Sequence, residues 1–110
     1  MKKYFEVEYL PEAEKFIEVQ DEKVRKKILY TISLATLTKS SDLFAKLSGD
    51  IWEFRTLYEK NYYRLFAFWD KAKAAYVICT HGIIKKSKKT PSKEIKKAEG
   101  IRKKYFENLI

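Results

Sequence analysis

The sequence has one cysteine, one histidine and three glycines among its 110 residues. Cys79 alone cannot form an internal disulfide or supply a cysteine-based zinc cluster, which indicates a reducing compartment. The glycines are isolated from one another, so there is no glycine-rich phosphate loop. The longest apolar runs are far shorter than the roughly 20 residues that span a bilayer, and the acidic N-terminal region lacks the apolar stretch of a signal peptide. We therefore expect a cytoplasmic protein without a membrane-spanning segment.

Apolar and basic residues are what the sequence has in abundance. The hydrophobic fraction of 45% and the aromatic fraction of 15% permit a compact core, and the length fits one domain over residues 1–110. Lysine and arginine number 24 against 15 acidic residues, a net charge of +9, and residues 71–110 alone carry 12 basic and 3 acidic groups. Such a concentration of charge favours a polyanionic partner such as nucleic acid, although lysine-rich helices are also common as solvated surfaces.

The first half of the chain predicts a short strand, a helical hairpin and a loop. Residues 4–9 alternate aromatic and β-branched residues with Glu, which is typical of a strand. Pro11 suits the first turn of a helix, and Asp21 suits the N-cap of a second helix. The apolar stripe of this second helix consists of Val24, Ile28, Ile32 and Ala35. Residues 38–50 are polar and rich in turn formers, so we interpret them as a loop. Its expected anchors to the core are Leu43, Phe44 and Leu47.

The second half predicts three strands and a helix. The strands are residues 51–58, 62–69 and 75–84, and their short connections make neighbours antiparallel. In the first of them Trp52, Phe54 and Thr56 face one side, and Glu53, Arg55 and Leu57 face the other. Thr90 as N-cap and Pro91 as first helical residue open the last helix. Its apolar stripe is Ile95, Ala98, Ile101, Tyr105 and Leu109. The order β-α-α-β-β-β-α predicts an α+β domain with an antiparallel-rich, twisted sheet.

The side chains offer little for metal or nucleophile chemistry. Cys79 and His81 lie two residues apart on a predicted strand and are expected to share a face. Two ligands without a carboxylate cluster make a poor metal site, and Cys79 is better explained as a small core residue. No serine sits in a nucleophile elbow. We therefore predict no metal and no other cofactor.

A group of cations lies on or beside the predicted strands. Arg55 and Arg64 fall inside strands, where an arginine is unfavourable unless its head reaches water, a carboxylate or a ligand. Taken singly, each is better explained by a salt bridge, for example to Glu53 or Glu59. The whole group, which is Arg55, Arg64, His81, Lys85, Lys86, Lys88 and Lys89, suits RNA cleavage by the 2′-hydroxyl. Cations then stabilise the phosphate, and His81 or a lysine activated by its neighbours transfers protons. Tyr62, Tyr63 and Trp69 are candidate base-stacking faces, or simply core residues.

Three segments of this region resemble a known family. Residues 49–55, Gly-Asp-Ile-Trp-Glu-Phe-Arg, resemble the G-x-hydrophobic-W-E-hydrophobic-R motif of RelE/HigB-type toxins of bacterial toxin–antitoxin systems, and Tyr63-Arg64 resembles the Y-R of their next strand. Residues 81–91, His-Gly-Ile-Ile-Lys-Lys-Ser-Lys-Lys-Thr-Pro, are similar to the H-G-F-x-K-K-x-x-K-T-P stretch of the phage Gp49-like, HigB branch, with Ile83 where that branch usually has Phe. Ile95 and Ala98 match the I-x-x-A of the following helix.

The resemblance implies a RelE/ParE-like fold and a toxin that is a ribosome-dependent, metal-independent mRNA endoribonuclease. Carried over by position, it implies catalytic roles for Arg55, Arg64, His81, Lys85 and Lys86. The implied RNA-binding residues are Tyr63, Lys88, Lys89 and Lys93. The implied partners are the ribosome, mRNA and a cognate antitoxin, usually a helix-turn-helix protein of the HigA type, with operator DNA bound only through the antitoxin complex.

Two other functions stay open on the sequence alone. A ParE-like inhibitor of DNA gyrase would share the architecture, although the 81–91 stretch argues against it. A nonenzymatic RNA-binding module would use the basic patch without cleaving RNA. For the antitoxin we expect an acidic segment that covers the basic cleft and cancels its attraction for RNA.

Overall fold

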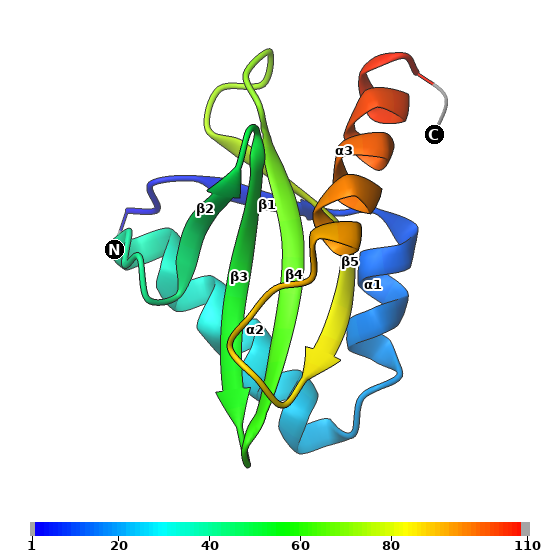
Figure 1. Ribbon diagram of the computed structural model, residues 1–110. Helices are drawn as coiled ribbons and strands as arrows, with labels where there is room; N and C mark the ends of the chain where they lie inside the picture. Colours follow the sequence, from blue (N-terminus) through cyan, green and yellow to red (C-terminus); the bar gives the residue numbers. More distant parts are fainter. Residues whose placement is uncertain (1, 109–110) are drawn as a thin grey trace.

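The computed structural model describes residues 2–108 and has an α+β architecture, as predicted (Figure 1). The order is β1 (Glu6–Tyr9), α1 (Pro11–Glu18), α2 (Glu22–Thr38), β2 (Phe44–Ser48), β3 (Ile51–Tyr58), β4 (Asn61–Asp70), β5 (Tyr76–Lys85) and α3 (Ser92–Phe106). The strands form one sheet in the order β1-β5-β4-β3-β2, in which only the β1–β5 pair is parallel. Leu109 of the predicted helix stripe lies outside the described residues.

The helical hairpin covers one face of the sheet. Pro11 begins α1, and the Asp21 carboxylate accepts a hydrogen bond from the Val24 N–H at 3.0 Å, so both predicted helix starts are confirmed. The predicted stripe of α2 is buried against sheet residues such as Phe54 and Leu65. Burial of these side chains, at about 1.5–3 kcal/mol each, is what holds the hairpin on the sheet.

The last helix covers the opposite face. Ala98 of α3 is fully buried beside Ile51, Phe66 and Phe68, and Ile95 and Tyr105 pack at the border of this second cluster. Because successive side chains of each strand point to opposite faces of the sheet, they contribute to two cores, one on each side. None of the helices within residues 2–108 is long and apolar enough to cross a membrane.

The prediction of a loop over residues 38–50 is wrong in part, because β2 lies within it. Phe44 stacks on Trp52 and Phe54 with ring centroids 4.9 and 4.3 Å apart, which draws this polar segment onto the edge of β3. The anchoring role of Phe44 is confirmed, and Leu43 and Leu47 pack at the borders of the two cores. The sequence does not reveal this strand because it is only five residues long and its flanks are polar.

The expectation that Cys79 and His81 share a face is also wrong. Phe66 pairs with His81 while its neighbour Ala67 pairs with Cys79, so Thr80 is an extra residue in β5. Such a bulge reverses the side-chain alternation beyond it. Cys79 is buried in the core beneath the helical hairpin, as predicted, whereas His81 stacks on the Phe66 ring with centroids 4.8 Å apart, on the face that α3 covers.

The start of the last helix differs from the prediction as well. The first residue of α3 is Ser92, Pro91 occupies the N-cap position, and no side chain caps the helix. Thr90 is therefore not the N-cap. Its hydroxyl instead forms hydrogen bonds with Glu53 and Arg64 of the sheet. The segment 86–91 crosses the face of β4 before α3 begins (Figure 1).

Candidate functional site

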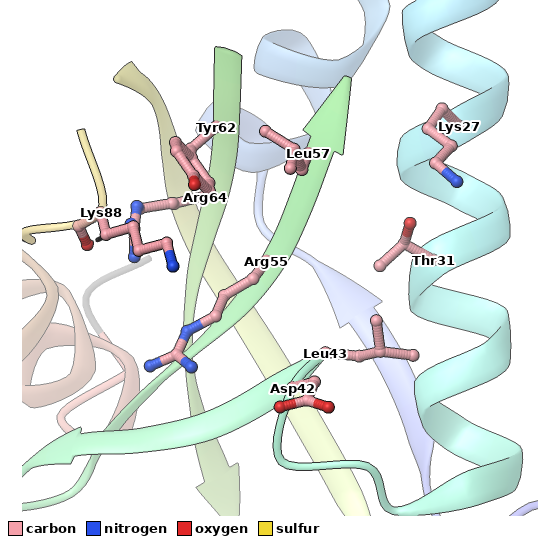
Figure 2. A pocket seen from close by; sticks show the side chains of 9 residues that line it. All are labelled: Lys27, Thr31, Asp42, Leu43, Arg55, Leu57, Tyr62, Arg64 and Lys88. Atoms are coloured by element: carbon pink, nitrogen blue, oxygen red, sulfur yellow. Dashed lines mark hydrogen bonds between the residues drawn. The ribbon is translucent and has the colours of Figure 1, made fainter. Parts of the chain in front are cut away.

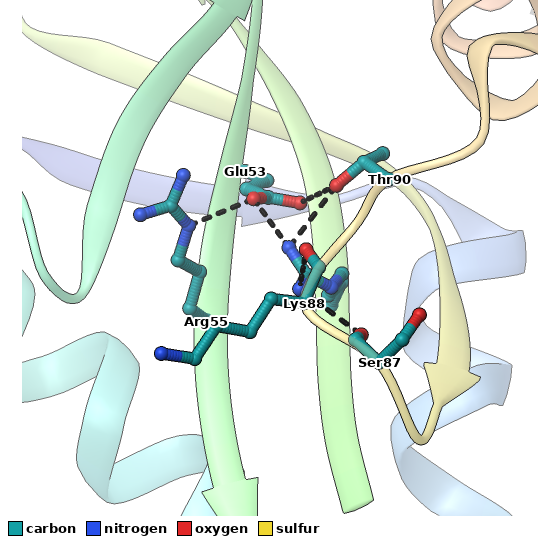
Figure 3. A network of polar contacts seen from close by, with 6 residues as sticks. Glu53, Arg55, Ser87, Lys88 and Thr90 are labelled. Atoms are coloured by element: carbon teal, nitrogen blue, oxygen red, sulfur yellow. Dashed lines mark hydrogen bonds and ion pairs between the residues drawn. The ribbon is translucent and has the colours of Figure 1, made fainter.

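A buried carboxylate, Glu53 of β3, organises the polar side of the sheet (Figure 3). It accepts hydrogen bonds from Arg64 at 2.6 Å, from Arg55 at 2.7 Å and from the Thr90 hydroxyl at 3.1 Å. Arg55 and Arg64 are partners in the register of β3 and β4 and therefore point to the same face. The sequence already offered Glu53 as a salt-bridge partner for either arginine, and it serves both.

Arg64 is only 2% exposed. Its guanidinium donates to Glu53, to the Thr90 hydroxyl and to the backbone carbonyls of Ser87 and Lys88. The arginine thus links the centre of the sheet to the segment 86–91. Because most of its donors are used in these bonds, Arg64 acts in this structure as an anchor for that segment.

An open cleft of about 550 Å³ lies beside this network (Figure 2). Arg55 and Leu57 of β3 and Tyr62 and Arg64 of β4 form its floor. Lys27 and Thr31 of α2 stand on one side, together with the turn before β2, and Lys88 lies on the other. The cleft opens at the edge of β3, because β2 pairs with β3 only as far as Phe54. The lining residues are Lys27, Thr31, Asp42, Leu43, Arg55, Leu57, Tyr62, Arg64 and Lys88.

The cleft is electropositive. Four of its lining residues are cationic and one, Asp42, is acidic. The Arg55 side chain is 38% exposed and uses its Nε for Glu53, which leaves the outer guanidinium nitrogens on the solvent side. Lys88 is exposed and extends toward Arg55 (Figures 2 and 3). One buried carboxylate cannot neutralise both arginines, so the surplus charge is available to an anion in the cleft.

The structure brings some of the predicted site residues together and separates others. Arg55, Arg64 and Lys88 meet at the cleft, and Lys85, the register partner of the cleft residue Tyr62, shares its face. Lys86, Lys89 and Lys93 are exposed on or just beyond the segment 86–91 and do not line the cleft. The Tyr63 ring is buried in the core beneath the helical hairpin, so the aromatic side chain at the cleft is that of Tyr62.

His81 lies away from the cleft and is 1% exposed. Its Nε2 is 3.0 Å from Glu94 of α3, and its Nδ1 is 2.9 Å from the Thr80 hydroxyl. Burial lowers the pKa of His81, and this outweighs the opposing effect of its hydrogen bond to Glu94. His81 therefore joins β5 to α3 as a neutral ring. Within residues 2–108, no group of three or more His, Cys, Asp or Glu side chains is placed to hold a metal ion.

Sequence reasoning missed two contributors to the site. Lys27 lies off the apolar stripe of its helix, and nothing local places it opposite Lys88. Thr90 was assigned to a helix cap. In the structure Pro91 takes the N-cap position, which leaves the preceding hydroxyl free for Glu53 and Arg64.

Three comparisons relate the chain to known proteins. The model of a family described as "Phage derived protein Gp49-like (DUF891)" matches residues 15–103. Among solved structures, a chain from the "Crystal structure of archaeal RelE-RelB complex from Pyrococcus horikoshii OT3" superposes with a TM-score of 0.52 at 10% sequence identity, covering 78% of this chain and 99% of that chain. No curated protein sequence matches. The expected RelE-type fold and the resemblance to the Gp49-like branch are thereby confirmed.

Proposed function

The chain belongs to the phage-derived Gp49-like family, and from this membership, the RelE-type fold and the cationic cleft we propose that it is the toxin of a toxin–antitoxin system that cleaves mRNA on the ribosome. The observation that carries the proposal is the cleft itself, where Arg55 on the floor and Lys88 beside it present free donors to a space large enough for a nucleotide. Arginine and lysine in this arrangement suit a phosphodiester.

Cleavage by the 2′-hydroxyl needs three things from the protein. A proton must leave the 2′-oxygen, charge on the phosphorus oxygens must be stabilised, and the 5′-oxygen must receive a proton. We assign phosphate stabilisation to Arg55 and Lys88, and stacking of a splayed base to Tyr62. Proton transfer falls to the lysines of the segment 85–89, because His81 is enclosed beneath α3.

The dependence on the ribosome has a physical rationale. Among the described residues that line the cleft, Asp42 is the only carboxylate and none is a histidine. In an open cleft with few proton-transfer groups, cleavage is accelerated when the ribosome holds the mRNA in an in-line geometry, since positioning supplies much of the rate in such reactions. Within this proposal the partners are the ribosome, mRNA and a cognate antitoxin of the helix-turn-helix type, which would carry any operator binding, and the location is the cytoplasm.

The test is primer extension on a defined mRNA in a purified translation system, with and without ribosomes. Arg55→Ala and Lys88→Ala are the informative variants because both side chains are solvent-accessible and neither is needed for the core. Lys104→Ala, which removes an exposed charge from α3, is the matched control. We expect discrete, ribosome-dependent cuts, weakened roughly 100-fold by each cleft variant and unchanged by the control.

Full cleavage by both cleft variants would refute this assignment of the site. Unimpaired translation with no cuts by the wild type would refute the nuclease, and purified gyrase and an RNA-binding titration would then separate the two other functions. Inhibited supercoiling with intact mRNA identifies a ParE-like activity. Salt-sensitive RNA binding without cleavage identifies a binding module.

A further inference from the structure

A second cavity, of about 250 Å³, lies at the other end of the sheet. It is framed by the turn between β2 and β3, the start of the β4–β5 connection and the last turns of α3, which lie together at the top of Figure 1. Trp52 and Trp69 line it with their indole rings 6.1 Å apart in a T-shaped arrangement. Both are partly exposed, unlike the phenylalanines of the two cores. The proposed function uses none of these residues.

The cavity is also cationic. Lys46, Lys71 and Arg102 line it against a single acidic residue, Asp50. The two lysines are exposed, and they approach from different elements, β2 and the connection after β4. A site that combines an aromatic wall with converging cations suits the two parts of a nucleotide, since the base can stack on the aromatic rings and the phosphate can form ion pairs with the cations.

Arg102 is the distinctive group. Its guanidinium lies over the Phe106 ring at 5.0 Å, which orients it, and its one ion pair with a described residue is a long 3.6 Å contact with Asp50. Its Nε is buried without a hydrogen-bond partner in the part of the chain that the structure describes. The Nε of Arg64 is buried without a partner as well, but the outer nitrogens of Arg64 donate to four protein acceptors, whereas among residues 2–108 those of Arg102 make only the long contact with Asp50. A buried donor of this kind favours an acceptor from a ligand.

We propose that this second cavity is a subsite for a nucleotide of single-stranded RNA, with Trp52 and Trp69 contacting the base and Arg102, Lys71 and Lys46 binding the phosphate. The subsite rests on the proposed function for its choice of ligand. Trp52 and Arg55 are three residues apart on β3, which corresponds to roughly 10 Å along the strand. Their side chains face opposite sides of the sheet, so one RNA chain that occupies both sites passes around the edge of the sheet. The two possible sources of this RNA are the messenger and the ribosome.

The sequence provides a direct probe, because its only two tryptophans both line this cavity. The experiment titrates the full chain with a short 2′-O-methyl oligoribonucleotide, which cannot be cleaved, and follows tryptophan emission at several salt concentrations. Heparin is the control for charge without bases. We expect saturable quenching by the oligonucleotide and little by heparin. Arg102→Gln should weaken binding roughly tenfold and lower the salt slope by about 0.7, and Lys71→Gln should weaken it less.

Two further variants separate this subsite from the cleft. Lys23→Gln removes a distant exposed charge, and Arg55→Ala alters the cleft. Quenching that is unchanged in Lys23→Gln, and that weakens more in Arg102→Gln and Lys71→Gln than in Arg55→Ala, supports the subsite even where no cleavage is seen. Absent quenching, equal quenching by heparin, or equal affinities of Arg102→Gln and Lys23→Gln would overturn it while leaving the cleft assignment intact.

The source of the RNA is resolved by co-sedimentation with ribosomes that carry no mRNA. If Arg102→Gln reduces this binding, the subsite takes ribosomal RNA. If ribosome binding is unchanged and mRNA cleavage weakens, it takes the messenger. Binding of an acidic peptide with unchanged RNA affinity in Arg102→Gln would assign the cavity to a protein and refute the proposal.

Discussion

Replacing Arg64 should unfold the protein far more readily than replacing Arg55, although the two are register partners and share one carboxylate. Arg64→Met keeps the volume of the side chain and removes its charge and donors. Glu53, which is fully buried, then keeps only Arg55 and the Thr90 hydroxyl as partners. Breaking a buried ion pair in this way destabilises by about 3–5 kcal/mol, a large part of the 5–15 kcal/mol typical of a domain.

The matched variant is Arg55→Met. Its side chain is 38% exposed, water screens its ion pair, and Glu53 retains Arg64. Its loss should therefore stay below about 1 kcal/mol. At roughly 4 °C per kcal/mol for a chain of this length, Arg64→Met should lower Tm by about 12–20 °C and Arg55→Met by about 4 °C or less. Thermal unfolding followed by circular dichroism measures both.

The double variant Glu53→Leu, Arg64→Met completes the test. Replacing both members of a buried pair by apolar residues of similar size is often close to neutral, and the carbonyls of Ser87 and Lys88 lie in an exposed segment that water can reach. The double variant should therefore be more stable than Arg64→Met alone. Equal losses in Arg64→Met and Arg55→Met, or a double variant less stable than both singles, would refute the view that a buried pair anchors the segment 86–91.

Four further outcomes follow from single residues. Gly82→Ala should destabilise by about 1–3 kcal/mol, because a Cβ there would lie 2.3 Å from the Phe16 ring. Gly100→Ala lies in the open interior of α3 and should stabilise the protein by about 0.5–1 kcal/mol. Thermal unfolding measures both variants, and Tm changes of the same sign in the two would contradict the packing argument. Burial holds the pKa of His81 below its ordinary value of 6.5, so just below that pH the unfolded chain binds a proton that the folded chain does not. The free energy of unfolding should therefore fall as pH drops below about 6.5. Chemical denaturation at several pH values should show this dependence in the wild type and its loss in His81→Gln. Burial raises the pKa of the Cys79 thiol, so iodoacetamide should modify it only after denaturation, and rapid labelling of the native chain would contradict its burial.

The elements predicted well are those with strong local chemistry. Asp21 caps α2 because its carboxylate reaches an N–H three residues away, and Pro11 begins α1 because its fixed φ suits that position. The alternation in β3 correctly placed Glu53 and Arg55 on the face opposite Trp52 and Phe54. In each case the cause lies within a few residues of its effect.

The features that escaped prediction depend on distant partners. The partners of Arg64 lie 11 to 26 residues away, on β3 and in the segment before α3. The bulge at Thr80 is visible only in the pairing of two strands, yet it decides which face His81 occupies. Lys27 reaches the cleft only because α2 packs beside the edge of β3. A sequence pattern identifies residue types at the site but does not show which of them face solvent.

The contrast between Arg55 and Arg64 changes how loss of activity should be interpreted. Both arginines lie in strands where motif matching gives them the same role, and either variant could abolish toxicity. Arg64 is enclosed and anchors the segment that carries Lys88, so its loss would displace a cleft cation without any direct contact with RNA. Arg55 keeps part of its guanidinium in the cleft, so its loss removes charge where a phosphate would bind. Of the two arginines, therefore, only Arg55 can be identified as a group that acts on the substrate, by a variant that is inactive although its Tm is nearly unchanged.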